Sequence, residues 1–473
     1  MRVVSVIIIV LVIAVVGMSY RFGMDTEYVY NDLIDQYTEG DAFSVVSRSY
    51  DRGILSSKAR TVFAVRNMGK EIVRLDETDT IYHGPIPVLA IFKGKAGPAP
   101  VLSVLDSRIK LAPAEGSGNA ELFEKIPPID AHTVISFKNK ATADMSMPGF
   151  ELDLEDGDKL SWKGFTGRVD YDTNEFHSLS DLESPGLQID GKDSTLTVTE
   201  IKAWSELSHP APDAEYPTGD VNFTVGKLDF LAKPGAKLRN LTITGIDFKG
   251  KNSERGGLLD SSHSMVFDEL TFGGDKYGPG GYELSISNID SRSWKKLQAL
   301  INANQNAADS EEAKARFTGE LVNLLPGFVS KSPKIELRKL SLETSGGKLE
   351  GHLGIYADGE GLENVDLAQN PVLMLAALTA DAGITVSKEL FVSALTDYKK
   401  EEVLENMKAM GEDPPTDEEL AELASGAAED EINLLVSGDI LVEKDDSYTI
   451  EAAYKSGQVI INGQPIDLGA LLQ

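Results

Sequence analysis

The chain opens with an uncharged, strongly apolar run from Val3 to Tyr20, bounded by Arg2 and Arg21. As a helix, this run would be about 27 Å long at about 1.5 Å per residue, close to the hydrocarbon thickness of a bilayer, about 30 Å. The pattern therefore predicts a single transmembrane anchor over residues 1–22. A cleaved signal peptide is the alternative, but its apolar core normally spans about 7–15 residues, and Gly17-Met18-Ser19 is a poor cleavage site.

From about residue 44 to residue 365, apolar and polar positions alternate between Gly, Pro and Asp turns, which indicates β-strands. One motif recurs there: two alternating apolar residues, one additional residue, then two more alternating apolar residues. Six copies begin at Leu196, Phe223, Leu241, Met265, Leu284 and Ile335. The middle four copies form two pairs, and the pairs are offset by 42 to 43 residues, which favours an internally repeated β-meander.

The additional residue in the motif has a structural meaning. Successive side chains of a strand point to opposite faces, so an unbroken strand would turn the second apolar pair to the other face. A one-residue bulge restores the original face and bends the strand. The motif thus predicts a large, curved, antiparallel sheet with one apolar face and one polar face. Two short strands that meet at a corner, or a chance match, are the alternatives.

Helical segments interrupt the predicted strands. Residues 293–330 form a helical insert, and a further helical zone covers residues 388–428, where Thr416 and Glu419 fit a capping box. A hairpin over residues 448–461 closes the chain. The predicted fold class is mainly β with helical insertions (α+β): a transmembrane helix, then a repeated sheet on which helices pack. The predicted regions are the anchor (1–22), a β-rich periplasmic region (23–365) and a C-terminal helical segment with its hairpin (366–473).

Composition excludes several functions. The 473 residues include no cysteine, which excludes disulfides, thiolate zinc sites and thiol nucleophiles. The formal net charge of −30 argues against a nucleic-acid partner, because phosphate binding requires clustered Lys and Arg. Ser293 and Lys296 match a Ser-x-x-Lys pattern, but the Ser-Asp-Asn and Lys-Thr-Gly elements that accompany it in penicillin-binding enzymes are missing. We therefore predict a non-enzyme, with no catalytic, metal or cofactor-binding residues and no cofactor.

Four segments resemble one known family. They are Tyr50-Asp-Arg-Gly-Ile-Leu-Ser-Ser57, His83-Gly-Pro-Ile-Pro87, Ile289-Asp-Ser-Arg-Ser-Trp294 and Gly457-Gln-Val-Ile-Ile-Asn-Gly-Gln464. Their order and spacing resemble the YdgA-like family of Gram-negative envelope proteins, whose domain has no assigned function. The resemblance implies an inner-membrane-anchored, β-rich envelope protein, and it supplies no catalytic residues. Arg52 and His83 are its marked positions, for which an ion pair and a strand end are the structural interpretations.

The leading functional expectation is a non-enzymatic periplasmic protein, held in the bacterial inner membrane through residues 3–20, that serves in envelope assembly or maintenance. An apolar sheet face could shield lipid or another apolar ligand, or a segment of an envelope protein. Two alternatives remain. One is a purely structural or interaction protein that acts as a homodimer or larger homo-oligomer. The other is an envelope hydrolase.

Overall fold

The computed structural model describes residues 2–37, 43–67, 70–117, 120–154, 157–208, 216–236, 238–305, 311–360, 373, 376–410, 415–455 and 457–466. These residues form 23 strands. The chain divides into two compact units. Unit 1 contains Met1–Leu238 and Ala299–Ala313, and unit 2 contains Arg239–Gln298 and Lys314–Gln473.

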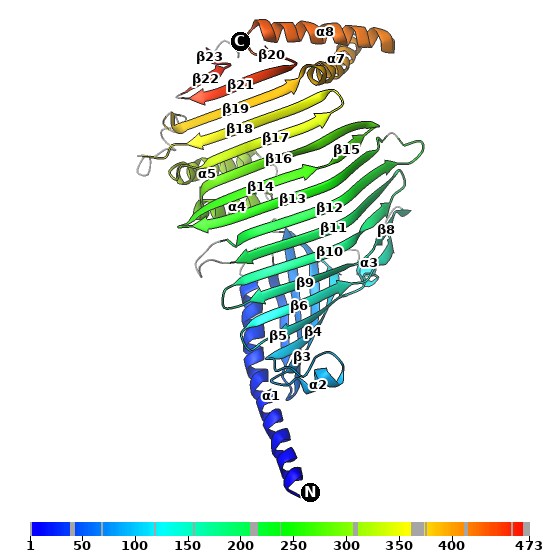
Figure 1. Cartoon of the computed structure of the whole chain (residues 1–473), viewed down its shortest axis with the longest axis vertical. Coiled ribbons are helices and arrows are strands. Elements are labelled where there is room, and N and C mark those ends of the chain that lie inside the picture. The colour runs from blue at the N-terminus through cyan, green and yellow to red at the C-terminus, as the bar shows by residue number, and fades with distance from the viewer. Residues whose placement is uncertain are drawn as a thin grey trace. The chain divides into compact units, whose positions relative to one another are not determined.

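Unit 1 is an antiparallel meander (Figure 1). Consecutive strands pair from β1 to β6, and again from β9 to β12. β6 pairs with β9 because β7 and β8 form a hairpin, and β8 pairs with the end of β10. The strands are β1 (Phe43–Asp51), β2 (Ser56–Asn67), β3 (Lys70–His83), β4 (Ser103–Pro113), β5 (Ile129–Ile135), β6 (Lys140–Met147), β7 (Phe150–Asp153), β8 (Lys159–Trp162), β9 (Phe165–Asp172), β10 (His177–Asp190), β11 (Ser194–Ser208) and β12 (Thr218–Ala232).

Helix α1 (Arg2–Tyr37) lies on one face of this meander, over β3 and β4 (Figure 1). Its Tyr30 and Ile34 are buried with Ile81 of β3 and Leu105 of β4. The opposite face of the same two strands is covered by α2 (Val88–Phe92), whose Ala90 is buried. A further short helix, α3 (Ala120–Glu124), lies between β4 and β5 in the chain.

Unit 2 is a second antiparallel meander. β13 pairs with both β14 and β15, and these two pair with β16. From β16 the order continues through β17, β18, β19, β21, β22 and β23, and β20 pairs with β21. The strands are β13 (Leu241–Arg255), β14 (Leu258–Phe267), β15 (Glu269–Phe272), β16 (Asp275–Asp290), β17 (Lys334–Thr344), β18 (Gly347–Ala357), β19 (Leu378–Ser387), β20 (Val442–Lys444), β21 (Ser447–Lys455), β22 (Gln458–Ile461) and β23 (Gln464–Ile466).

Two helix pairs interrupt the second meander. α4 (Ser291–Gln305) and α5 (Glu311–Val329) follow β16, and α7 (Lys388–Met410) and α8 (Asp417–Ser437) follow β19. The second pair buries apolar side chains against the sheet, among them Ile432 of α8 with Val386 of β19 and Tyr448 of β21. The capping box predicted at Thr416 is confirmed, since its side chain and that of Glu419 each accept a hydrogen bond from the other residue's backbone N–H.

The N-terminal part of the predicted fold class is wrong. In the part of the chain that the structure describes, no helix is both long and apolar enough to cross a membrane. The helix does not end with the apolar run at Tyr20 but continues to Tyr37, and its second half packs on β3 and β4. This finding contradicts the transmembrane anchor over residues 1–22 and the single-pass inner-membrane localisation.

Candidate ligand-binding surface

The additional residue of the recurrent motif is present as a backbone irregularity. In β17 the register with both neighbouring strands shifts between Leu337 and Leu340, as a one-residue bulge requires. In β11, β13 and β16 the corresponding residues Glu200, Gly245 and Asn288 have φ angles of 54°, 65° and 59°. One such left-handed residue begins a class of bulge and moves the alternation of side chains by one position.

In unit 1 these irregularities lie side by side on neighbouring strands. Glu200 of β11 lies opposite Pro185 of β10 and Gly226 of β12, and the pairing register is the same on both sides of it. Gly226 is required by this proximity, because a Cβ at that position would lie 2.8 Å from the Glu200 Cβ. We call Pro185, Glu200 and Gly226 the bulge row. The three strands therefore change their alternation together.

Apolar side chains occupy one face of the sheet on both sides of the bulge row. Directly paired residues share a face, so the pairs Val198–Leu228 and Ile201–Val225 place the motif side chains of β11 and β12 together. We call this surface the apolar face of unit 1; it consists of Leu182, Leu187, Ile189, Leu196, Val198, Ile201, Ala203, Phe223, Val225, Leu228 and Phe230. Among the described residues, none of these side chains belongs to a buried hydrophobic cluster, although Val225 is itself buried. Phe223 is 42% exposed, and the other members are half-buried.

The other face of the same strands carries charges in pairs. Lys202 lies 3.1 Å from Glu183, and Arg168 lies 3.3 Å from Asp144. The hydrogen bond to Glu183 raises the pKa of Lys202. The two faces therefore differ clearly in chemistry: one carries paired charges, and the other carries apolar side chains that are partly exposed at Phe223.

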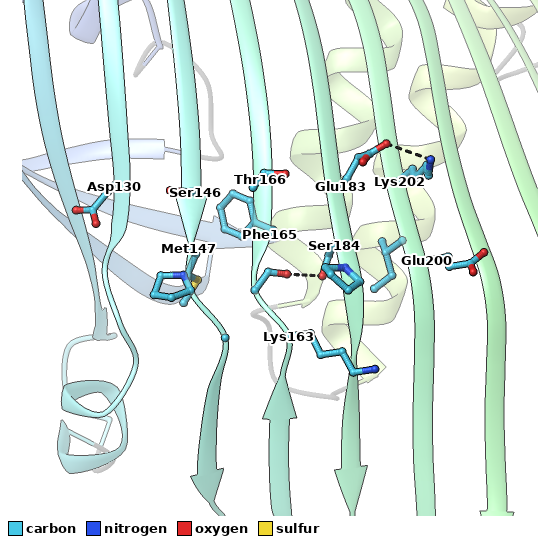
Figure 2. Close-up of a pocket in the computed structure, with 15 residues that line it drawn as sticks. Asp130, Ser146, Met147, Lys163, Phe165, Thr166, Glu183, Ser184, Glu200 and Lys202 are labelled. Carbon is cyan, nitrogen blue, oxygen red and sulfur yellow. Dashed lines mark hydrogen bonds and ion pairs between the residues drawn. The ribbon is translucent and has the colours of Figure 1, made fainter. Parts of the chain in front are cut away.

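A cavity of about 680 Å³ lies along the bulge row (Figure 2). One set of its lining residues forms a continuous cross-strand row on the charged face: Asp130, Ser146, Thr166, Glu183 and Lys202. Met147, Phe165 and Ile201 add apolar lining, and the buried Ser184 hydroxyl donates a 2.6 Å hydrogen bond to the Gly164 carbonyl. The volume is typical of small-molecule sites, about 300–1,000 Å³.

The apolar face continues across the sheet to the strands beneath α1, where its character changes. The ladder of directly paired residues runs Leu182, Gly167, Met145, Ala131, Ser107, Asp79 and Ala59. Under α1 this face is mixed: the polar residues Thr61, Asp79, His83 and Ser103 are buried there beside the apolar cluster that includes Ile81 and Leu105. From the helix, Ser19 and Thr26 are buried against it.

Tyr30 of α1 is the centre of this buried polar cluster. Its hydroxyl donates a 2.6 Å hydrogen bond to Asp79 Oδ2 and lies 3.1 Å from Thr61 Oγ1. Glu77 lies two residues before Asp79 on the same face, and the buried Oδ1 atom of Asp79 has no hydrogen-bond partner among the described residues. Burial, and then the charge of Asp79, raise the pKa of Glu77 to about 8, and burial also raises the pKa of Asp79.

Both marked positions of the family resemblance lie against α1. The Nδ1 atom of His83 lies 3.1 Å from the Ile54 carbonyl oxygen and its Nε2 atom 2.8 Å from Ser57 Oγ. Because a carbonyl only accepts, Nδ1 carries the proton and the Ser57 hydroxyl donates to Nε2. Burial lowers the pKa of His83. Arg52 forms a 3.0 Å ion pair with Glu27 of α1. The structure thus gives both residues a role in holding the helix.

The remaining sequence candidates do not form a reactive site. Ser293 is buried near the start of α4, where its backbone N–H donates to Asp290, and Gly327 of α5 packs against its hydroxyl, whereas Lys296 is exposed. Within the described ranges, no group of three or more His, Cys, Asp or Glu side chains is placed to hold a metal ion.

Comparison with known proteins assigns the chain to a family. Residues 1–469 match the model of a family described as a bacterial protein of unknown function (DUF945). The chain belongs to this family. No curated protein and no solved structure matches the chain. Membership extends over nearly the whole chain, so both units and α1 fall within the family's domain.

Sequence reasoning missed the buried cluster of Tyr30, Glu77 and Asp79. A signal for it exists in the spacing of β3, where Glu77, Asp79, Ile81 and His83 alternate on one face. An isolated strand with acids at alternate positions is ordinarily interpreted as solvent-facing. Only the position of α1 over this face shows that the acids are covered.

Proposed function

We propose that this chain is a YdgA-like member of its family, and that it is a non-catalytic protein that shields the acyl chains of a lipid on the apolar face of unit 1. The role that fits such a protein is assembly or maintenance of the cell envelope. The four sequence segments quoted above support the finer family name. The binding role is supported by the partly exposed apolar face of unit 1.

The exposure of that face carries the proposal. Apolar surface left in water costs about 25 cal/mol per Å², and a folded chain normally covers it with its own helices. On β10, β11 and β12 the apolar side chains lie on one face on both sides of the bulge row, and Phe223 remains 42% exposed. An acyl chain has the chemistry to cover this surface, because it needs no hydrogen-bonding partners.

The charged face supports the same assignment indirectly. Its Lys202 and Arg168 already have carboxylate partners, so a ligand there would compete with existing ion pairs. An acyl chain gains nothing from those groups. The apolar face offers it hydrocarbon contacts instead, at exposed side chains such as Phe223.

Two exposed apolar residues of β12 allow a matched test. Phe223 belongs to the apolar face, whereas Leu231, 46% exposed, pairs with Thr195 on the opposite face. The purified full chain would be titrated with a phospholipid whose acyl chain carries a fluorophore. We expect saturable binding, weakened about fivefold by F223Q because about 1 kcal/mol of apolar contact is lost, and unchanged by L231Q.

The outcomes separate the alternatives. Absence of lipid binding, or equal losses in F223Q and L231Q, would refute the proposal. Light scattering of the same samples tests whether a second copy covers the face: a dimer that F223Q dissociates, without lipid binding, would favour the homo-oligomer. Hydrolysis of the labelled lipid during the titration would favour the hydrolase instead.

A further inference from the structure

Helix α1 covers two buried carboxyl groups that have no basic partner. Asp79 is fully buried and Glu77 half-buried, and both point from β3 toward the helix. Tyr30 donates its hydrogen bond to Asp79 Oδ2 from the helix, and Ser107 of β4 lies directly opposite Asp79 in the sheet. Among the described residues, the buried Oδ1 atom of Asp79 has no hydrogen-bond partner. Two ionised carboxylates in such a site would repel each other without solvent screening.

The charged groups around the pair are occupied elsewhere. On β1, Arg48 pairs with Asp35 of α1 at 2.9 Å, and Arg52 just beyond it pairs with Glu27 at 3.0 Å. Tyr50 of β1 packs against the Tyr30 ring, with centroids 5.7 Å apart. From the remaining elements, β2 presents Thr61, β4 presents Ser107, and β3 itself presents His83 further along the same face. No ion pair from Lys or Arg reaches either carboxyl group in the described part of the chain.

We propose that α1 is a proton-dependent cover: it stays on β2, β3 and β4 while Glu77 and Asp79 share one proton, and it leaves this face when both are ionised. In the docked state Asp79 Oδ2 accepts from Tyr30, and the shared proton lets Glu77 donate to the buried Oδ1 atom of Asp79, which has no other partner among the described residues. Loss of that proton removes one donor and adds a second negative charge. Release exposes both carboxylates to water, which solvates them.

The pH range follows from the proton linkage. The ordinary pKa of Glu77 is 4.5, and in the docked state burial raises it to about 8, so the docked state binds the proton more tightly. Protonation stabilises the docked state fully below the ordinary pKa of Glu77. This stabilisation is lost as the pH rises through the raised pKa that Glu77 has in the docked state. The docking equilibrium falls by at most about tenfold per pH unit across this range, because one proton is involved.

Release of α1 would also enlarge the surface available to a ligand, since the helix covers one end of the ladder that leads to Leu182. This regulatory consequence rests on the proposed lipid binding. The release itself does not, and its test contains no lipid. A failure of one proposal is therefore distinguishable from a failure of the other.

The test measures the distance between α1 and the sheet. Because the chain has no cysteine, Y28C in α1 and K110C in β4 create the only two thiols, and both native side chains are exposed. Spin labels at these positions in the full chain would be measured by pulsed electron paramagnetic resonance at pH 5.5 and pH 9. We expect one short distance at pH 5.5 and an added population of long distances at pH 9.

Variants on the same labelled background identify the proton site. Gln donates as neutral Glu does and does not ionise, so E77Q should keep the short distance at both pH values. E121Q, at an exposed acid of α3, should behave like the parent. If E77Q does not fold, E77L removes the same ionisation and should also abolish the pH response. An unchanged distance in the parent at pH 9, or a pH response that survives in E77Q or E77L, would overturn the proposal.

Discussion

The two ends of one sheet face in unit 1 differ in what covers them. Beneath α1 the face buries an apolar cluster that includes Ile81 and Leu105, together with the polar side chains of Thr61, Asp79 and His83. On β10, β11 and β12 the same face is apolar, and its Phe223 remains 42% exposed. Apolar contact holds the helix on the covered end, while the buried acids give that contact groups whose charge can change. The comparison favours a ligand at the partly exposed end and a reversible helix contact at the covered end.

The sharpest test of the covered end is steric. A Cβ on Gly23 would lie 2.5 Å from His83 Cε1, so G23A should push α1 away from β3 and destabilise the chain by about 2 kcal/mol in urea unfolding. Gly17 of the same helix has nothing within 4 Å of a Cβ. G17A should therefore stabilise slightly, by up to about 1 kcal/mol, as Ala does in a helix. Equal effects of the two variants would show that α1 does not pack closely on His83.

The next largest effect concerns the hydrogen bond across that contact. Y30F leaves buried Asp79 without its donor from α1, and a bond to a charged acceptor contributes about 2 kcal/mol, so the urea midpoint should fall. Tyr28 is 74% exposed on the same helix, and Y28F should leave the midpoint unchanged. If Y30F left the urea midpoint unchanged, the hydrogen bond from α1 to Asp79 would contribute nothing to stability.

A smaller effect is expected from acid. Because burial lowers the pKa of His83 below its ordinary 6.5, its neutral form favours the folded state above pH 6.5, and this contribution is lost as pH falls through the lowered pKa. H83Q should therefore lose less stability than the parent between pH 7.5 and pH 5, by about 1 kcal/mol in urea unfolding.

The smallest effect belongs to the charged face beside the partly exposed end. Lys202 and Glu183 form an exposed pair, and such pairs contribute little because water and salt screen them. K202Q should leave both the urea midpoint and the lipid affinity unchanged within error. A clear loss of lipid affinity in K202Q would place the ligand against the charged face rather than on the apolar face.

The bulges of the sheet could be predicted because their cause is local. A strand that must show Leu196, Val198, Ile201 and Ala203 on one face needs an additional residue between the pairs, and Glu200 supplies it with a positive φ. Spacing within eight residues holds all of this information. It does not reveal whether a helix covers the resulting face, because the helix lies far away in the chain.

The errors and omissions arose from contacts that a local pattern cannot show. Hydropathy from Val3 to Tyr20 fits a membrane span, but the helix continues beyond it, and Ser19, Gly23 and Thr26 form a narrow side that approaches the sheet. Tyr30 and Asp79 are 49 residues apart, so nothing near either one indicates their hydrogen bond. The family segments around Arg52 and His83 lie at the contact with α1, but nothing in these segments indicates that α1 is the element they contact.

The alignment of Pro185, Glu200 and Gly226 on adjacent strands has an evolutionary consequence. Deletion of Glu200 alone would turn every later side chain of β11 to the opposite face of the sheet. The apolar side chains of β11 would then lie on the face where the neighbouring strands carry charged side chains. Removal of one residue from each of the three strands at the bulge row would keep their side chains on the same face, and would only remove the bend in the sheet. Insertions or deletions at the bulge row should therefore occur together in all three strands, so that family members that differ in length there should differ in several strands at once.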